Sequence, residues 1–482
     1  MSLTSAINSA LSGLQVTSLR ADTVATNIAN ASTPGYVRRA LIVSEALVGG
    51  STAGVRSEGV ARSQNAAITE ERRAISTNLA QANILTTSRQ TLSVRIGNSL
   101  DSTGLFSRFA TFETALSEAA LTPESSTQAA NLLDSAVAVA NEFNALSSFI
   151  ERQRAEADRG ISEGVEIVNQ SLRQVEKLNG RIAGSQAGSD EEAALVDERQ
   201  RALDTIAEFV PIESFLRPNN VIDVLTPEGV FLLSGSARQI AFSPSAAFSP
   251  DASLAGGQLS GLSVGDIDIT PGVPTYGAVS GGALGALFQL RDDDLPTLSN
   301  QLDTLASDLI SRVSDDTVDP SKIPGDPGIF LDSDPTLGPG VAGRIRVNAA
   351  VDPNQGGDLF RLRDGLGAVA AGPPGNNEIL SRLSNAISTV RSINENGLEG
   401  GFSSAELASH LSAIVGQDRI NQEAVLSSTV TQLEVLIDAE QSISGVDIDE
   451  QLQTLLLVEQ AFAANARVIE VTGQLLNQLL EI

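Results

Sequence analysis

Three chemically versatile residue types are missing or nearly missing from the chain. Among its 482 residues there is no cysteine, no tryptophan and a single histidine, His410. The absence of cysteine excludes disulfides, thiolate nucleophiles and cysteine-containing zinc sites. Since no second histidine can complete a metal site, His410 is expected to be a surface or half-buried helix residue. Most enzyme chemistry that depends on these side chains is therefore excluded.

Positive charge and long apolar runs are also scarce. The 31 basic residues are outnumbered by 59 acidic ones, which gives a net charge of -28. Such a surface repels nucleic-acid phosphates and anionic lipids. No run approaches the roughly 18 apolar residues of a membrane-spanning helix, and the first residues lack the basic start of a secretory signal. We expect no nucleic-acid partner, no membrane insertion and no cleavable export signal.

Proline is concentrated in the middle of the chain. Sixteen of the 18 prolines lie between Pro211 and Pro374, two precede this block and none follows it. Because an interior proline disrupts a helix, the two flanking arms are compatible with long helices. The centre is expected to consist of strands and loops, and its segment 315–375 is the richest in proline and glycine.

The N-terminal arm begins with an amphipathic pattern. Apolar residues recur every three or four positions and predict one helix with a single apolar stripe. The stripe comprises Leu3, Ile7, Ala10, Leu14, Thr17, Ala21, Val24 and Ile28, and only Thr17 interrupts its apolar character. Further along the chain, helices are predicted over 63–96, 124–179, 197–209 and 285–313, a loop or hairpin over 49–59, and a hairpin over 221–233.

The C-terminal arm, residues 378–482, is predicted to contain two helical segments separated near Gly445. In the second segment an apolar row recurs at intervals of seven, as in a coiled coil. This apolar row comprises Ile448, Leu455, Phe462, Ile469 and Leu476. A flanking row comprises Ala461, Val468, Leu475 and Ile482. The pattern fits two arrangements: the terminal helices pair with each other, or both are ordinary core helices of one domain.

No motif for catalysis or cofactor binding stands out. The spacing of Gly338, Gly340 and Gly343 matches a dinucleotide loop, but a strand rather than a helix is predicted to follow, so a plain turn is expected. The run Asp292–Asp294 lacks the spaced ligands of a calcium loop. Carboxylates are plentiful, but no pair indicates a hydrolase. We expect no cofactor, no metal and no catalytic residue.

Both ends of the chain carry segments that resemble one protein family. The segments Ser9–Gln15, Asn27–Asn30 and Thr33–Arg38 closely resemble the opening signature of flagellar rod, hook and hook-associated proteins. Ser444–Glu450 and Glu459–Val468 are similar to the closing signature of the same axial family. The residues that carry the signature most clearly are Asn27, Asn30, Pro34, Gly35, Tyr36, Gly445 and Asn465.

Segments in the interior of the chain resemble one branch of that family. Asp197–Leu203, Ser234–Gln239 and Gly281–Asp292 are similar to the hook-associated protein 1 branch, whose members join hook and filament. The resemblance implies a multidomain α+β fold in which the terminal helices pair into a coiled coil or helical rod and a β-rich domain is inserted centrally. It also predicts a terminal region (1–45 with 441–482) that is mobile in the free chain, a helical rod (46–196 with 376–440) and a β-rich outer domain (197–375).

The function implied is structural, with no catalysis. Expected partners are other copies of the chain in a ring-like assembly, the hook protein, a second junction protein, the flagellar type III export apparatus and an export chaperone at the C-terminal helix. The expected location is the extracellular flagellum, after a cytoplasmic stage. A rod or hook subunit is the alternative within the family, and an exported cell-wall hydrolase on a flagellar scaffold is the alternative outside it.

Overall fold

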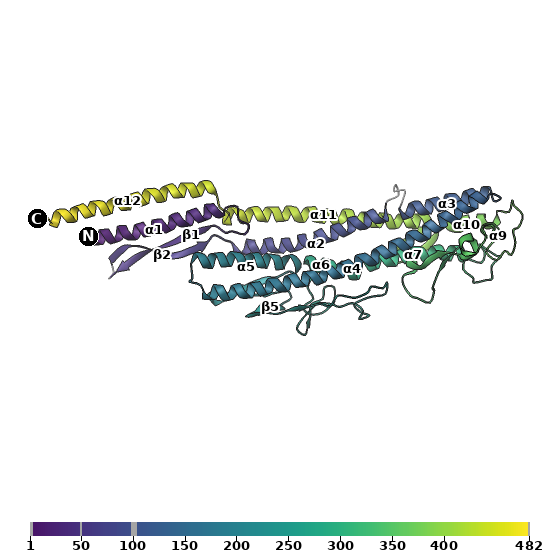
Figure 1. Cartoon of the computed structure of the whole chain (residues 1–482), viewed down its shortest axis with the longest axis horizontal. Coiled ribbons are helices and arrows are strands. Elements are labelled where there is room, and N and C mark those ends of the chain that lie inside the picture. Colours follow the sequence, from purple (N-terminus) through teal and green to yellow (C-terminus); the bar gives the residue numbers. More distant parts are fainter. Residues whose placement is uncertain (1–2, 49–50, 98–103, 481–482) are drawn as a thin grey trace.

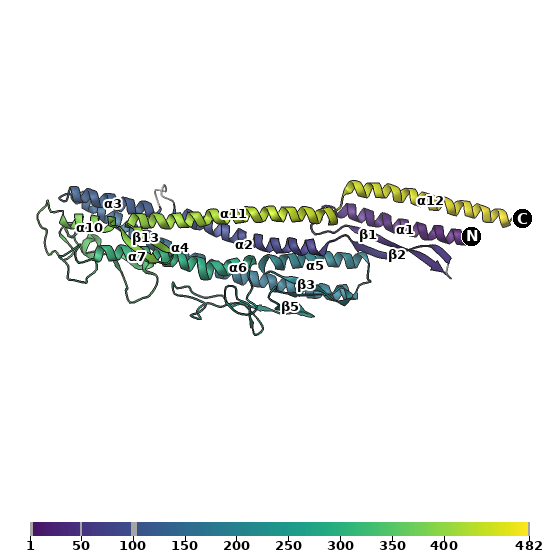
Figure 2. The same cartoon turned by 180° about the vertical axis from the view of Figure 1, so that it is seen from behind.

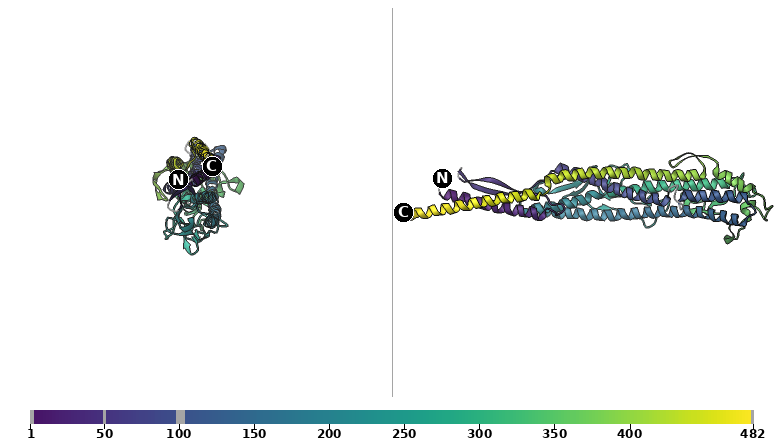
Figure 3. Two further views of the ribbon diagram at one scale, coloured as in Figure 1. Left: turned by 90° about the vertical axis from the view of Figure 1, so that its left-hand side faces the viewer. Right: turned by 90° about the horizontal axis from the view of Figure 1, so that it is seen from above.

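The protein is a long helical rod with both chain ends at the same end of the molecule (Figure 1). The computed structural model describes residues 3–48, 51–97 and 104–480, so the outermost residues of the predicted terminal region and Ile482 of the flanking row lie outside it. Seen from behind, the rod consists of a slender section with α1 and α12 and a thicker section beyond it (Figure 2). The view from above shows the long helices running beside one another along the thick section (Figure 3).

The chain passes from the slender section into the thick one and returns. The helices are α1 (Leu3–Asn30), α2 (Ala66–Ile96), α3 (Leu105–Leu121), α4 (Ser126–Gly184), α5 (Asp190–Phe209), α6 (Gly282–Gln289), α7 (Leu295–Ser314), α8 (Val341–Arg344), α9 (Phe360–Asp364), α10 (Glu378–Ser388), α11 (Ser404–Ser444) and α12 (Ile448–Leu480). A π-helical segment, η2 (Leu290–Asp294), joins α6 to α7, and the short 3-10 helices are η1 (Pro218–Asn220), η3 (Ala349–Val351) and η4 (Pro353–Gln355).

The strands form small antiparallel sheets along the rod. Their bounds are β1 (Arg39–Val48), β2 (Ser51–Arg62), β3 (Glu213–Leu216), β4 (Ile222–Leu225), β5 (Phe231–Ser234), β6 (Ser236–Ala237), β7 (Ile240–Ala241), β8 (Ser263–Val264), β9 (Ile267–Asp268), β10 (Phe330–Asp332), β11 (Ile345–Val347), β12 (Arg391–Glu395) and β13 (Leu398–Phe402). The sheets are β1-β2, β3-β4-β5-β6, β7-β8-β9, β10-β11 and β12-β13. All five are therefore local hairpins or meanders.

Local signals account for the ends of the long helices. The Asn65 side chain caps α2 by accepting a hydrogen bond from the Ala67 amide, and Gly97 ends it at φ 77°. Ser403 and Glu406 form a reciprocal capping box at the start of α11. The helices predicted over 63–96 and 124–179 are confirmed as α2 and α4, and the helix predicted from the N-terminal stripe is confirmed as α1.

The core of the thick section is built around α4, the longest helix. Its buried residues contact α3, α7, α10 and α11 in one apolar cluster that includes an edge-to-face pair of Phe109 and Phe143 with ring centroids 5.8 Å apart. A second cluster joins α4, α5 and α6 to the sheets β3 to β9. The small sheets thus lie against a helical body rather than forming a core of their own.

The C-terminal arm differs from the predicted pattern. The C-terminal arm holds α10 and the hairpin β12-β13 before α11, so the prediction of only two helical segments there was wrong. The hairpin turns at Asn396 and Gly397, both with positive φ. The helix predicted over 285–313 is confirmed as α6, η2 and α7, and α7 packs in the α4 cluster. The multidomain α+β class is confirmed, while the domain boundaries stay a prediction.

Candidate assembly surface and joint

The two terminal helices lie side by side and run in opposite directions (Figures 1 and 3). Near the thick section, the Asn27 amide nitrogen donates a hydrogen bond to Oε1 of Gln451 over 3.0 Å. Further out, Gly13 approaches Asn465 so closely that a Cβ on Gly13 would lie 2.8 Å from the Asn465 amide. Positions fall by 14 on α1 and rise by 14 on α12 between these contacts, as expected for an antiparallel coiled coil.

The row of α12 that is most shielded is largely polar. Gln451, Val458 and Thr472 are about 5% exposed, and Asn465 is half-buried at the same heptad position. We call these four residues the central row. The apolar repeat at intervals of seven predicts a different row, which lies next to the central row on the helix surface.

The apolar row predicted from the sequence is only partly covered by α1. Leu455 and Ile469 are half-buried, whereas Ile448, Phe462 and Leu476 are 48%, 49% and 37% exposed. On the outer side of α12, Leu452, Leu456 and Leu457 are also exposed. A helix pair in water normally buries its largest apolar residues at the contact. Here much of this surface has no neighbour within the described chain.

On α1 the predicted stripe is divided between two neighbours. Val24 is buried, and Leu3, Ile7, Leu14 and Ile28 are half-buried. The hairpin β1-β2 packs along the same helix, where the amide of Val55 donates a hydrogen bond to Oγ of Ser12. The stripe thus serves both the hairpin and α12, and its assignment to assembly stays a prediction.

Asn27 is the centre of a buried hydrogen-bond network at the joint between the two sections. Its side chain is 1% exposed and uses its full bonding capacity. The amide nitrogen donates to the carbonyl of Arg39 and to Gln451, and Oδ1 accepts from the amide of Arg39 and the hydroxyl of Tyr36. One side chain therefore connects α1, the following loop, β1 and α12.

The loop between α1 and β1 is shaped by the other signature residues. Asn30 donates to the carbonyl of Thr26 and accepts from the Thr33 hydroxyl, which ends the helix in a turn. Gly35 has φ 74°, and a Cβ there would lie 2.9 Å from Cγ of Arg201. The Arg201 guanidinium donates to the carbonyl of Pro34. This turn therefore requires glycine both for its backbone and for its contact with α5.

Charged side chains fasten the base of the hairpin to α5. Arg39 and Arg62 both pair with Asp197, at 3.4 and 2.6 Å, and all three side chains are at least nine-tenths buried. The Arg39 guanidinium also lies 5.1 Å from the centroid of the Tyr36 ring. Burial raises the pKa of Tyr36 above its ordinary value, although Arg39 acts in the opposite direction, so its hydroxyl remains a proton donor to Asn27.

The end of α11 is held at the same joint. The amide of Arg38 donates to the carbonyl of Ser444 over 2.8 Å, and Gly445 follows in extended conformation before α12 begins. Glu440 pairs with Arg72 of α2, which also pairs with Asp204 of α5. Six of the seven signature residues, all except Asn465, thus lie at this joint.

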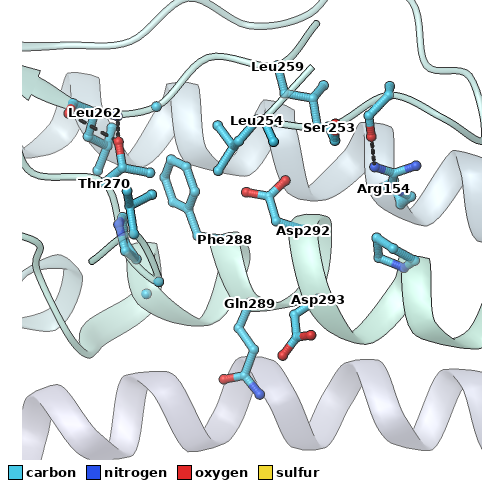
Figure 4. A pocket seen from close by; sticks show the side chains of 18 of the residues that line it. Arg154, Ser253, Leu254, Leu259, Leu262, Thr270, Phe288, Gln289, Asp292 and Asp293 are labelled. Atoms are coloured by element: carbon cyan, nitrogen blue, oxygen red, sulfur yellow. Dashed lines mark hydrogen bonds between the residues drawn. The ribbon is translucent and has the colours of Figure 1, made fainter. Parts of the chain in front are cut away.

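A cleft on the side of the thick section bears on the hydrolase alternative (Figure 4). It lies between the 250–281 loops and η2, with Phe288 in its wall. The Asp292 carboxylate accepts hydrogen bonds from Nε and Nη2 of Arg291, at 2.8 and 2.9 Å. Asp293 extends to the opposite side of the helix, so the two carboxylates do not converge as a glycosidase pair would.

The remaining sequence motifs take ordinary places. His410 is half-buried, and its ring stacks on Phe402 at 4.7 Å. Gly340 has φ 98° and precedes the short helix α8, which leads into β11. Within residues 3–48, 51–97 and 104–480, no cluster of acidic or histidine side chains could hold a metal. In the same part of the chain, no helix combines the length and hydropathy needed to cross a bilayer.

Several residues of the joint escape prediction from the sequence. Gln451 and Arg39 both bond to Asn27, which lies more than 10 positions away along the chain, and no local pattern marks them. Asp197 and Arg201 lie in the segment Asp197–Leu203, but the resemblance does not indicate their contacts with Arg39 and Pro34. The interval of seven from Gln451 through Val458 to Asn465 could have indicated a third heptad row, beside the apolar row and the flanking row. Its polar composition hides it from a search for apolar periodicity.

Comparisons with known proteins agree along most of the chain. Residues 91–328 match the model of the flagellar hook-associated protein FlgK helical domain, and residues 7–36 match that of the flagella basal body rod protein. The chain is 24% identical over 560 aligned positions to flagellar hook-associated protein 1 of Escherichia coli K12, with both chains fully covered. It is 22% identical to the Bacillus subtilis 168 protein of the same name, over 95% of this chain and 94% of that one.

Two further matches cover a smaller part of the chain. The Salmonella typhimurium LT2 protein, also named flagellar hook-associated protein 1, is 28% identical over 315 residues, which is 63% of this chain and 55% of that one. The solved structure of the flagellar hook junction protein FlgK from Burkholderia pseudomallei aligns with a TM-score of 0.44 and 19% identity, over 55% of this chain and 47% of that one.

Proposed function

Because the chain belongs to the family of flagellar hook-associated protein 1, we propose that it is a structural subunit of the junction between the hook and the filament of a bacterial flagellum. The observation that carries this proposal is that α1 and the thick helical section both match models of flagellar proteins. In the same chain, signature residues such as Asn27 connect α1 to α12. The subunit's role is mechanical, with no reaction catalysed.

Copies of the chain associate through α1 and α12 in a ring-like assembly. The whole chain carries a net charge of -28, so contacts between copies through most of its surface are opposed by like-charge repulsion. Helix α1 is the exception, since Arg20 and Asp22 are its only charged residues and their charges cancel. Helix α12 carries four acidic residues and Arg467, so its contact with a second copy depends on its apolar side chains. The exposed apolar side chains of α12 then become covered by a second copy.

The terminal helices become rigid on assembly. A two-helix section with exposed apolar surface gains less from burial than the thick section, so in the free chain it is the least stable part. The thick section stays folded and carries the small sheets on its outside. The hook protein on one side and a second junction protein on the other complete the set of neighbours.

Delivery to this position uses the flagellar type III export channel, without a cleavable signal. A cytoplasmic chaperone binds the C-terminal helix before export, since the exposed leucines of α12 would otherwise associate. The mature location is the extracellular part of the flagellum.

The decisive experiment is deletion of the gene in its motile host, followed by electron microscopy of the cell surface and an assay for flagellin in the medium. Bare hooks with flagellin released into the medium are expected. Absent hooks would assign the chain to the rod or hook subunits, and normal filaments would refute a flagellar role. Cleavage of peptidoglycan by the purified chain would refute the purely mechanical role.

A further inference from the structure

The rotation of α12 about its own axis differs from what apolar burial alone would favour. The central row faces α1 with Gln451, Asn465 and Thr472, while the exposed Phe462 lies in the adjacent apolar row. In a coiled coil with 3.5 residues per turn, rows three positions apart differ by about 50° around the helix. A rotation of that size would place the apolar row against α1 and bury it.

Two contacts oppose this rotation. Gln451 accepts a hydrogen bond from Asn27, whose other bonds are all made within the joint, so a rotated α12 would leave a buried amide hydrogen without a partner. Asn465 lies where α1 has Gly13, and the absence of a side chain there makes room for it. A larger side chain such as Phe462 has no equivalent space at this position.

We propose that Gln451 and Asn465 are positioning residues that hold α12 in the rotation at which its apolar row stays open for a second copy of this chain. The polar contacts sacrifice burial within one chain, as buried asparagines do when they select one arrangement of a coiled coil. The benefit to assembly rests on the proposed function, but the rotation is a property of the single chain. It is therefore tested without a flagellum.

The test uses a tryptophan reporter, because the chain contains none. In Phe462→Trp, acrylamide quenching should report an accessible side chain, since Phe462 is 49% exposed. Adding Gln451→Ala and Asn465→Ala should release the rotation and lower the quenching constant by about threefold, toward the value of a residue at a central heptad position. Unchanged quenching, or a shielded reporter in the otherwise intact chain, would overturn the proposal.

Two matched controls separate rotation from other effects. Gln453→Ala with Gln460→Ala alters two exposed residues of the same helix and should leave the reporter of Phe462→Trp accessible. A reporter in Leu457→Trp, at a position that is 65% exposed on another face, should stay accessible in every variant. Shielding of both reporters by the alanine pair would contradict a rotation, because it would mean general burial of α12.

A second measurement does not require the contacts at Gln451 to be removed. The chain has no cysteine, so pairs can be introduced one at a time. Gly13→Cys with Asn465→Cys should form a disulfide at least about tenfold faster than Gly13→Cys with Ala466→Cys, because residues adjacent in a helix point about 100° apart. Equal rates would show that α12 has no fixed rotation and would refute the proposal.

Discussion

At the scale of single residues, the joint depends on side chains whose bonding capacity is fully used. Asn27→Ala removes the partners of the Arg39 amide and carbonyl and of the Tyr36 hydroxyl. Buried groups without partners destabilise by about 1–3 kcal/mol each, so a local loss of about 3 kcal/mol is expected. Amide hydrogen exchange at Arg39 measures it directly. The same change at exposed Asn8 should leave that exchange rate unaffected.

Two glycines should respond to alanine with opposite signs. Gly35→Ala forces a Cβ onto Arg201 at φ 74° and should destabilise the chain by about 1–2 kcal/mol. Gly180 lies exposed within α4, with no atom within 4 Å of a built Cβ, so Gly180→Ala should stabilise it by about 0.5–1 kcal/mol. Chemical denaturation of both variants checks this. A stabilising Gly35→Ala would contradict the role assigned to the turn.

Glu113 provides a pH-dependent prediction. Burial, with a smaller contribution from Glu406, raises the pKa of Glu113, so its charged form destabilises the folded chain at neutral pH. The folded pKa lies above the unfolded one, and this penalty therefore disappears as pH falls through the folded value. Glu113→Gln should stabilise the protein at pH 7 and lose that advantage in acid, as followed by thermal unfolding. Exposed Glu118→Gln on the same helix is the control.

At the scale of elements, prediction from sequence succeeds where the signal lies within the helix itself. The apolar stripe of α1 and the absence of glycine and proline from 63–96 are local signals, and both helices end close to their predicted bounds. The hairpin β12-β13 was missed because its strands are short and lack alternation. The contact row of α12 was missed because polar residues occupy it, and their partners on α1 lie hundreds of residues away in sequence.

The exposed apolar row gives a prediction about one helix. Phe462→Asp and Leu476→Asp should prevent incorporation into the junction while leaving the thick section folded, because assembly would bury the new charge. Complementation of the deletion strain, with circular dichroism of the purified variants, provides both readouts. Gln453→Asp places the same charge on the far side of α12 and should complement. Normal junctions from the first two variants would refute the assignment.

At the scale of the whole molecule, charge governs association. Copies that each carry -28 repel one another, and salt screens this repulsion with a Debye length of about 10 Å at 0.1 M. Raising the salt concentration should therefore increase self-association of the purified chain, as measured by sedimentation velocity. Association that weakens with salt would indicate ion pairs between copies and contradict an apolar contact.

A small tilt at the joint produces a larger displacement at the far end of the rod. The 41 residues of α11 span about 60 Å at a rise of about 1.5 Å per residue. One end of this helix is fastened beside Asn27, and the other lies toward the far tip of the rod (Figure 1). A tilt of about 5° at the joint consequently moves the far end of α11 by about 5 Å, a displacement close to the pitch of one α-helical turn. Small adjustments among a few side chains are thus magnified into a subunit-scale displacement, while the thick section itself remains undeformed.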